Sequence, residues 1–564
     1  MNEYFELNAL IADDSPVMLS SIRRILFGMG FKDSNVVHVK DPKAVLYQAK
    51  KEAFDVVICD FNFMNRLNGR QIFEELNHYG LLKDTSVFMM VTGESSAKVV
   101  RAIIELMPDE YLLKPFNATY LNKKLSRAIN RRKALGKLYG AHNNKEYEKG
   151  LTLCDELEFD HHKYYSLIQK FRGEFLRYLN RYREAKELYE GLLEDNDTEW
   201  ANVGLVDSYI EMGDVVKAQS LINEYLEKVP SSVSMLNMSA KSDIYSSDIP
   251  SAVKKFEYLS EISPGNPDRE LVIANLCFSQ GDYNTAANRY MVYFDLSKDT
   301  YRNTVESRYN VIRTLLCYYN SLGNKEPTTL GNTTSPGRKV KPEIYFEYHQ
   351  ISQSHQADVE YGDGGGTHIS SFMSKELVEA HIHEIEGNIK HSILMLKHAF
   401  KVTKWDNFYE LFHFAYLLSL FMYDKEFNAV ISKTEFFINN KEIDPLVLNS
   451  MIAMISKLKE KHVKQKNYIK KTMGNYESMI QQGNVSLAID ELIKLTIKAP
   501  YFRDGNLLLI KNMVSAWPTN YTRGRTKKIL KVCYERCKGL YTTEEMLEHG
   551  ISTQYENALQ GLER

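Results

Sequence analysis

The sequence predicts a mixed α/β domain built on a five-stranded parallel sheet, followed by an all-helical superhelix of stacked helix pairs. Three observations lead to this fold class. Strand-like apolar runs alternate with amphipathic helical patterns over residues 1–132. Strand patterns then disappear from the chain. In their place, an alanine with a large partner four residues later recurs at intervals of 33, 34 and 34 residues.

The first 132 residues contain five strand patterns with helical patterns between them. Such β–α units favour a parallel sheet with helices on both faces, and ligands bind such sheets at the carboxyl ends of the strands. The strand patterns are NALIAD, NVVHV, FDVVICDF, SVFMMVTG and EYLLK, and the helical patterns cover 16–27, 42–52, 69–77, 97–107 and 120–131.

Polar residues stand where four of these strands end. Asp13 and Asp14 close the first strand, Asp60 the third, Thr92 the fourth and Lys114 the fifth. Each alone is an ordinary strand terminus, since turns favour such residues. Together they place three carboxylates, a hydroxyl and an ammonium at one edge of the sheet. A divalent cation would offset the repulsion between the acids, and all-oxygen ligation favours Mg²⁺.

Four short motifs carry a family resemblance: ADDS, CDFN, VTGE and LLKPF follow the first, third, fourth and fifth strands. With them, residues 1–132 resemble the receiver domain of bacterial response regulators of the chemotaxis-regulator kind. The resemblance implies a flavodoxin-like sheet of order 2-1-3-4-5. It also implies that Asp60 accepts a phosphoryl group from a phosphohistidine of a sensor histidine kinase or phosphotransfer protein.

The resemblance assigns the metal site residue by residue. Asp14 and Asp60 would bind Mg²⁺ together with the backbone carbonyl of Asn62, and Asp13 would contribute through a water molecule. Magnesium is the cofactor expected.

The resemblance also assigns the phosphoryl contacts. Thr92 and Lys114 would each bind a phosphoryl oxygen, as catalytic partners of Asp60. Thr92 and Tyr111 would form the switch, with Tyr111 moving inward on activation. The Lys114–Pro115 peptide is expected to be cis, a form that only X-Pro bonds adopt cheaply.

The alanine-spaced helical part resembles the tetratricopeptide repeat. Small residues let paired helices approach, and large ones fill the adjacent groove. Pro230 and Pro264 end their units twelve residues after the alanine. The pairs are Ala185 with Tyr189, Ala218 with Ile222, Ala252 with Phe256, and Ala286 with Tyr290.

This pattern divides the chain into four segments: a receiver domain at 1–132, tetratricopeptide-like repeats at 133–320, a long loop at 321–370, and further repeats with C-terminal helices at 371–564. A weaker unit at 143–157, with Gly150 at the alanine position, would use the last receiver helix as its first helix. The basic residues at 131–133 would alternatively form a hinge.

Two further motifs admit a functional and a structural interpretation. HIHEIEGNIKH at 381–391 is rich in histidine, but its spacing does not match a metal site, so a repeat helix is the better reading. KLKEKHVKQKNYIKK at 457–471 would either bind an acidic partner or form a solvent-facing helix.

The composition argues against nucleic-acid binding, secretion and membrane insertion. With 71 basic and 73 acidic residues, the chain shows no excess that indicates nucleic acid as a partner. The start lacks a signal-peptide pattern, and the longest apolar run, FAYLLSLFMY, is too short to span a membrane. Six scattered cysteines fit a reduced, cytoplasmic protein.

The leading hypothesis is a two-component response regulator, phosphorylated on Asp60, whose output is protein binding through the repeats. It would not be an enzyme beyond phosphoacceptor and auto-dephosphorylation chemistry. The partner is an unknown protein, another response regulator among the options, and homodimerisation stays open. The alternative is an accessory phosphate sink or sequestering regulator that inhibits phosphotransfer to another response regulator. A hidden enzyme within 321–400 is a third option.

Overall fold

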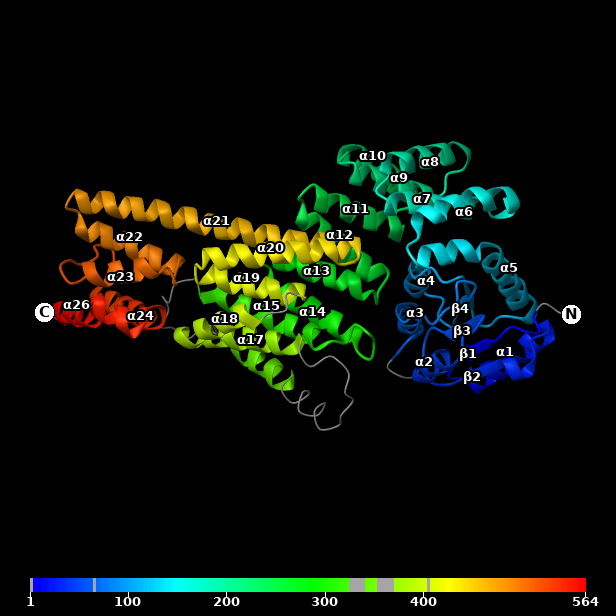
Figure 1. Ribbon diagram of the computed structural model, residues 1–564, viewed down its shortest axis with the longest axis horizontal. Coiled ribbons are helices and arrows are strands. Elements are labelled where there is room, and N and C mark those ends of the chain that lie inside the picture. The colour runs from blue at the N-terminus through cyan, green and yellow to red at the C-terminus, as the bar shows by residue number, and fades with distance from the viewer. Residues whose placement is uncertain (1–3, 64–66, 324–339, 352–369, 403–405, 564) are drawn as a thin grey trace. The chain divides into compact units, whose positions relative to one another are not determined.

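The computed structural model describes residues 4–63, 67–323, 340–351, 370–402 and 406–563 (Figure 1). The chain divides into two compact units. The first comprises Met1–Arg269 and Leu296–Asn303, and the second comprises Glu270–Asp295 and Thr304–Arg564. Each unit is described separately below.

The first unit begins with a five-stranded, all-parallel sheet of order β2-β1-β3-β4-β5, as the sequence predicts. Because the strands are parallel, the carboxyl ends of β1, β3, β4 and β5 meet at one edge. The strands are β1 (Ala9–Ala12), β2 (Val36–Val39), β3 (Val56–Asp60), β4 (Val87–Thr92) and β5 (Glu110–Leu113).

Helices cover both faces of this sheet. Alternate strand residues face opposite layers: Ile11 packs with α1 and α5, whereas Leu10 packs with α2, α3 and α4. Helix α1 starts as the sequence predicts, with Pro16 in its first turn and the Ser15 hydroxyl accepting a hydrogen bond from the Met18 amide. The five helices are α1 (Pro16–Met29), α2 (Pro42–Lys51), α3 (Gly69–His78), α4 (Ala97–Glu105) and α5 (Ala118–Asn143), and a 3₁₀ turn spans Asp33–Asn35.

Helix α5 runs for 26 residues without a break. Leu121 and Leu125 belong to the core of the α/β domain, whereas Leu135 and Leu138 belong to the core of the first helix pair. The segment 131–133 is therefore helical, and the last helix of the α/β domain is also the first helix of the repeats. The hinge alternative is not observed.

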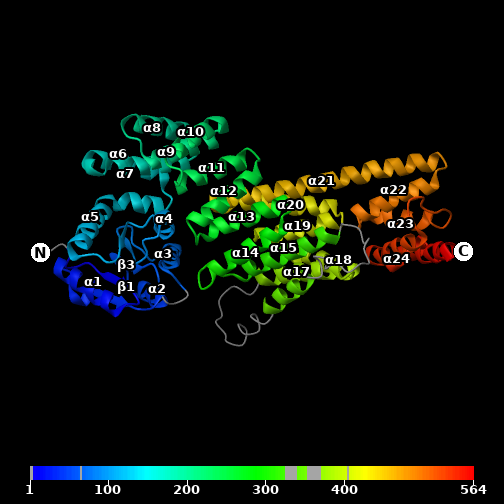
Figure 2. The same ribbon diagram turned by 180° about the vertical axis from the view of Figure 1, so that it is seen from behind.

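The remaining helices of the first unit pack one after another along the chain, as seen from behind in Figure 2. Ala185, Ala218 and Ala252 of the repeat pattern are fully buried at these contacts. The helices are α6 (Tyr147–Asp160), α7 (Tyr165–Tyr178), α8 (Tyr182–Asp195), α9 (Glu199–Glu211), α10 (Val215–Lys228), α11 (Val233–Tyr245) and α12 (Ile249–Ile262), with a 3₁₀ turn at His162–Tyr164.

Tyr189 shows why the pattern needs small residues beside large ones. Its buried ring lies directly on two glycines of neighbouring helices, Gly173 in α7 and Gly204 in α9. A Cβ at either position would collide with the ring. The absence of a side chain at these glycines therefore sets how closely the three helices approach.

Gly204→Ala is expected to destabilise the first unit by about 1–3 kcal/mol, because overpacking forces the Tyr189 ring or a helix to move. Gly191→Ala is the matched control, since Gly191 lies in α8 with nothing within 4 Å of an added Cβ. The control is expected to be neutral or stabilising by up to about 1 kcal/mol, because alanine favours helix. Thermal unfolding followed by circular dichroism measures both, and equal midpoints would contradict the packing argument.

The second unit is all-helical among its described residues. It contains α13 (Pro267–Gln280), whose first turn belongs to the first unit, α14 (Tyr283–Ser297), α15 (Val305–Gly323), a helix at 340–351, α17 (Ser370–Ile385), α18 (Ile389–Val402), α19 (Phe408–Leu420), α20 (Asp424–Asn440), the long α21 (Pro445–Gln481), α22 (Val485–Lys498), α23 (Arg503–Asn512), α24 (Arg523–Leu540), α25 (Thr543–Glu548) and α26 (Ile551–Glu563). The late repeats correspond to the adjacent pairs α17–α18, α19–α20 and α21–α22.

The segment 321–370 is not a continuous loop. Residues 340–351 form a helix that buries Val340, Ile344 and Ile351. These side chains are spaced for one helical face, which gives the helix an apolar side to pack. The predicted loop stretches 324–339 and 352–369 lie outside the described residues.

One histidine of the histidine-rich motif lies in the core, whereas the others are half-buried or exposed. His381 in α17 is fully buried, and its ring is 2.9 Å from the His413 ring nitrogen and 3.0 Å from the Asn320 amide nitrogen. Burial lowers the pKa of His381 to about 3, so the ring is neutral at physiological pH. No described helix is both long enough and apolar enough to cross a membrane.

Candidate functional site

The three predicted acids meet at the carboxyl edge of the sheet. Asp13 and Asp14 follow β1, and Asp60 is the last residue of β3. One carboxylate oxygen from each lies within 4.8 Å of the others. Asp13 and Asp60 are buried, with 1% and 5% exposure, whereas Asp14 is half-buried. Within the described ranges, this is the one cluster of three acidic, histidine or cysteine side chains placed to hold a metal ion.

Lys114 reaches the same point from the end of β5. Its ammonium nitrogen lies 2.7 Å from Asp13 Oδ2 and 3.1 Å from Asp60 Oδ1. The Lys114–Pro115 peptide is cis, as the sequence predicts. Three strand ends therefore place one cation and two buried carboxylates in direct contact.

Thr92 and Asn62 complete this edge. Thr92 is the last residue of β4 and fully buried, and its hydroxyl accepts a hydrogen bond from the Glu94 amide at 3.0 Å. Asn62 follows β3, and its exposed amide donates to Glu94 Oε1 at 2.6 Å. Glu94 lies two residues after the end of β4. Its bonds to Thr92 and Asn62 connect the loops after β3 and β4.

Tyr111 lies in β5, which β4 separates from β3 and Asp60. Its ring is half-buried against the core of α2, α3 and α4. The Lys124 ammonium sits 5.1 Å from the ring centroid and donates to the Tyr111 carbonyl oxygen at 3.0 Å. The aromatic side chain is thus held beside α4 and α5.

Burial dominates the electrostatics of Asp60. Desolvation raises its pKa to about 6, the nearby Asp13 and Asp14 charges add to the rise, and Lys114 opposes it. Asp13 and Asp60 together raise the pKa of Lys114 despite its burial, so the lysine stays charged. The neighbouring Cys59 thiol is fully buried, and burial raises its pKa well above its usual value.

The donor set fits a hard dication. Asp60 Oδ1 is buried and accepts no well-directed hydrogen bond from the described residues, although Lys114 is close. Together with the Asp13 and Asp14 carboxylates, this oxygen forms a donor set that matches the all-oxygen ligation of Mg²⁺. A bound dication would neutralise the mutual repulsion of the acids and the charge of an incoming anionic group.

Comparison with known proteins identifies the N-terminal domain. Residues 9–126 match the model of the response regulator receiver domain. The N-terminal domain is a receiver domain. The receiver is 28% identical over 125 residues to the chemotaxis protein CheY-3 of Vibrio cholerae, an alignment of 22% of this chain and 93% of the relative. It is 26% identical over 125 residues to the chemotaxis protein CheY of Pseudomonas aeruginosa, with 22% and 98% covered.

Among solved structures, the chemotaxis response regulator CheY4 of Vibrio cholerae matches with 25% identity, covering 22% of this chain and 98% of that chain at a TM-score of 0.20. These matches concern the receiver. The helical repeats that follow are described by the structure itself.

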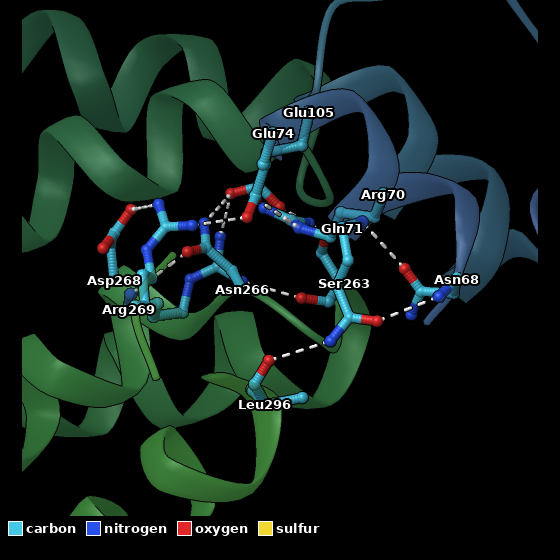
Figure 3. A network of polar contacts seen from close by, with 11 residues as sticks. Asn68, Arg70, Gln71, Glu74, Glu105, Ser263, Asn266, Asp268, Arg269 and Leu296 are labelled. Atoms are coloured by element: carbon cyan, nitrogen blue, oxygen red, sulfur yellow. Dashed lines mark hydrogen bonds and ion pairs between the residues drawn. The ribbon is translucent and has the colours of Figure 1, made fainter. Parts of the chain in front are cut away.

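The receiver contacts the helical part of its own unit at the end of α4 (Figure 3). Glu105, the last residue of α4, accepts hydrogen bonds from the Ser263 hydroxyl at 2.6 Å and from the Asn266 amide at 2.9 Å. It also forms an ion pair with Arg269. The Arg269 guanidinium is buried and donates to the Ser263 carbonyl oxygen at 2.7 Å. Helix α4 also packs on α11 and α12.

A second contact joins α3 to the segment 296–303 of the same unit. The Gln71 amide donates to the Leu296 carbonyl oxygen at 2.9 Å, while its own oxygen caps α3 through the Asn68 amide (Figure 3). Glu74 forms an ion pair with Arg302 at 2.6 Å. The His78 ring stacks on Tyr301 with centroids 3.7 Å apart.

The strand-end pattern pointed to the acids, Thr92 and Lys114, and all of them lie at the carboxyl edge of the sheet, where Lys114 contacts Asp13 and Asp60. Glu94 is part of the VTGE motif that the sequence analysis singled out, whereas the two contacts of α3 and α4 with the helical part were not found there. Glu105 and Arg269 are 164 positions apart, and nothing in their local sequence distinguishes them from surface charges.

Proposed function

We propose that this chain is a two-component response regulator in which Asp60 is the phosphoacceptor and tetratricopeptide-like repeats carry the output by binding protein. The observation that carries the proposal is the direct bonding of both helices α3 and α4 to the repeat region of the same unit. A receiver whose flanking helices are held by repeats is placed to report its phosphorylation state to them.

The phosphoryl transfer uses the side chains at the sheet edge. A carboxylate oxygen of Asp60 attacks the phosphorus of a phosphohistidine, the O–P bond forms, and the P–N bond breaks. The imidazole leaves with the bonding electron pair and takes a proton. Lys114 and Thr92 are positioned to bind the oxygens of the transferred group, and charge stabilisation of this kind dominates phosphoryl transfer.

Helix α4 gives one route from Asp60 to the repeats. The new group adds about −1.5 to −2 charge at the edge of the sheet, by analogy with other phosphorylated residues. A Thr92 hydroxyl drawn toward that charge gives up the Glu94 amide, which lies in the loop leading into α4. A shift of α4 then acts on Glu105 at its other end, where Arg269 is buried.

Helix α3 gives a second route. Its first residue, Gly69, lies so close to the Asp60 backbone that a Cβ would collide with it. The Gly69 amide donates to the Phe61 carbonyl oxygen at 2.8 Å. Residues two to six positions further along α3 bind Leu296, Tyr301 and Arg302. Both helices next to the phosphoacceptor thus end on the repeats.

Beryllofluoride with Mg²⁺, which stands in for the phosphoryl group on Asp60, is expected to increase amide hydrogen exchange in 97–106 and 259–269. The reason is that a shifted α4 weakens the contact between Glu105 and Arg269. Hydrogen exchange with mass spectrometry on the full chain measures the change.

Asp60→Asn is the control, and its exchange should not respond to beryllofluoride. The contradicting outcome is slower exchange of the wild type around 60–62 and 92–94 with unchanged exchange in 97–106 and 259–269. It would mean that beryllofluoride binds the receiver without any effect on the repeats.

A further inference from the structure

The second unit contains a pocket of about 290 Å³ where α13, α14, α19 and α21 meet. Its floor is apolar and buried. Phe278 packs edge-on against Phe412, with ring centroids 5.4 Å apart, and against Tyr283 at 5.0 Å. Tyr416, Met454 and Leu458 complete the floor. These contacts fix the aromatic rings, so the floor is formed before any ligand arrives.

The rim of this pocket is basic. Lys457, Lys461 and Lys464 line one side, with Glu460 as the acid among them. The three lysines stand at i, i+4 and i+7 of α21, which places them along one face of the helix. All three are exposed.

The three lysines differ in their ion pairs. Glu460 pairs with Lys457 at 3.0 Å and with Lys464. Lys461 forms no ion pair with a described acid, and its ammonium lies 5.7 Å from the Tyr416 ring centroid, at the border between rim and floor. The rim thus keeps a net positive charge directly above an apolar surface.

We infer that this pocket, hereafter the lysine-rimmed pocket, binds an acidic peptide segment that places one large apolar side chain on the aromatic floor and carboxylates against the lysines. The inference rests on the proposal that the repeats carry the output, and it adds the chemistry of the partner. The lysine-rich segment 457–471 then has a binding role in addition to its exposure to solvent.

Size and spacing support a peptide. The volume is at the lower end of the ~300–1,000 Å³ typical of ligand pockets, which suits one large side chain better than a cofactor. Seven residues of helix rise by about 10 Å, which matches about three residues of an extended chain. An extended peptide with one apolar residue flanked by acidic residues can therefore lie along the row of lysines.

A nucleic acid is the less favoured occupant. It would need a basic surface long enough to follow a phosphate backbone. Here the basic stripe lies on one helix, carries Glu460 within it, and belongs to a chain with 71 basic and 73 acidic residues. The buried aromatic floor fits a side chain inserted from above.

Selection of short random peptides displayed on phage tests the inference. The full chain is the target, and the double variant Lys457→Glu with Lys461→Glu is used for counter-selection. We expect the surviving peptides to carry Asp or Glu beside one large apolar residue. The best peptide, fluorescently labelled, is then titrated by fluorescence anisotropy. The double variant should weaken its binding about tenfold or more, since close charge pairs are reversed.

Two further variants make the result specific. Lys470→Glu with Lys471→Glu changes the charge of the same helix equally, at exposed positions outside the pocket, and should leave affinity within about twofold. Gln280→Trp, at an exposed residue lining the pocket, should block binding by filling the floor. Circular dichroism confirms that each variant is folded.

The inference fails if the selection yields no peptide that separates wild type from the rim variant, if the enriched peptides lack acids, or if the two lysine pairs weaken binding equally. Single-stranded RNA competing as well as the peptide would also overturn it. These outcomes are independent of Asp60, because the assay uses unphosphorylated protein. Failure of the proposed function, seen as absent phosphorylation with intact peptide binding, is therefore distinguishable.

Discussion

Asp60→Asn is expected to abolish labelling of the chain by radiolabelled acetyl phosphate in the presence of Mg²⁺. The amide is not a carboxylate nucleophile, and Asp60 is the acid of the cluster that stands at the end of β3, 3.1 Å from Lys114. Chelation of Mg²⁺ should reduce labelling of the wild type strongly, because three carboxylates then repel the incoming phosphoryl group. Acid-quenched gel electrophoresis with phosphorimaging measures both effects.

Glu52→Gln serves as the control, because Glu52 is an exposed acid at the end of α2. It should be labelled like the wild type. Persistent labelling of Asp60→Asn would mean that another residue accepts the phosphoryl group. Labelling of wild type that does not respond to chelation would remove the magnesium site from the proposal.

Glu105→Ala is expected to destabilise the contact between α4 and the repeats by about 3 kcal/mol, because it removes the Glu105 carboxylate from its ion pair with the buried Arg269 guanidinium. Arg269 keeps its bonds to backbone carbonyls, so the helix pair itself should remain folded. Faster hydrogen exchange in 97–106 and 259–269, without beryllofluoride, is the expected readout.

Glu187→Ala, which removes an exposed acid on α8, is the matched control and should leave exchange in both segments unchanged. The swapped pair Glu105→Arg with Arg269→Glu should recover part of the protection, since the opposite charges meet again. Unchanged exchange in Glu105→Ala would show that α4 is held by apolar packing on α11 and α12, and that the ion pair is dispensable.

The α/β fold and its acidic edge were predictable because local patterns determine them. Each strand is a short apolar run, and parallel strands bring their carboxyl ends to one edge. Asp60 and Lys114 could therefore be placed together from positions 54 residues apart, without any knowledge of the rest of the structure. The alanine spacing of the repeats is similarly local, since Ala185 and Tyr189 stand one turn apart.

Contacts between distant elements were not predictable. Glu105 and Arg269 look like ordinary surface charges until the fold brings them together. The lysine-rimmed pocket draws on four helices, of which the sequence analysis considered only α21 as a binding segment. The helix at 340–351 was missed because Gly-, Ser- and Thr-rich stretches on both sides obscured the apolar spacing of Val340, Ile344 and Ile351.

The unbroken course of α5 has a consequence for how the protein folds. One helix supplies side chains to two apolar cores, and Arg132 near its midpoint also anchors Asp109, which precedes β5, at 2.6 Å. Melting either core frays the helix that the other requires. The signalling module and the first stacked pair are therefore one cooperative folding element, whose natural boundary falls after Asn143 or later, beyond the end of the family match at residue 126.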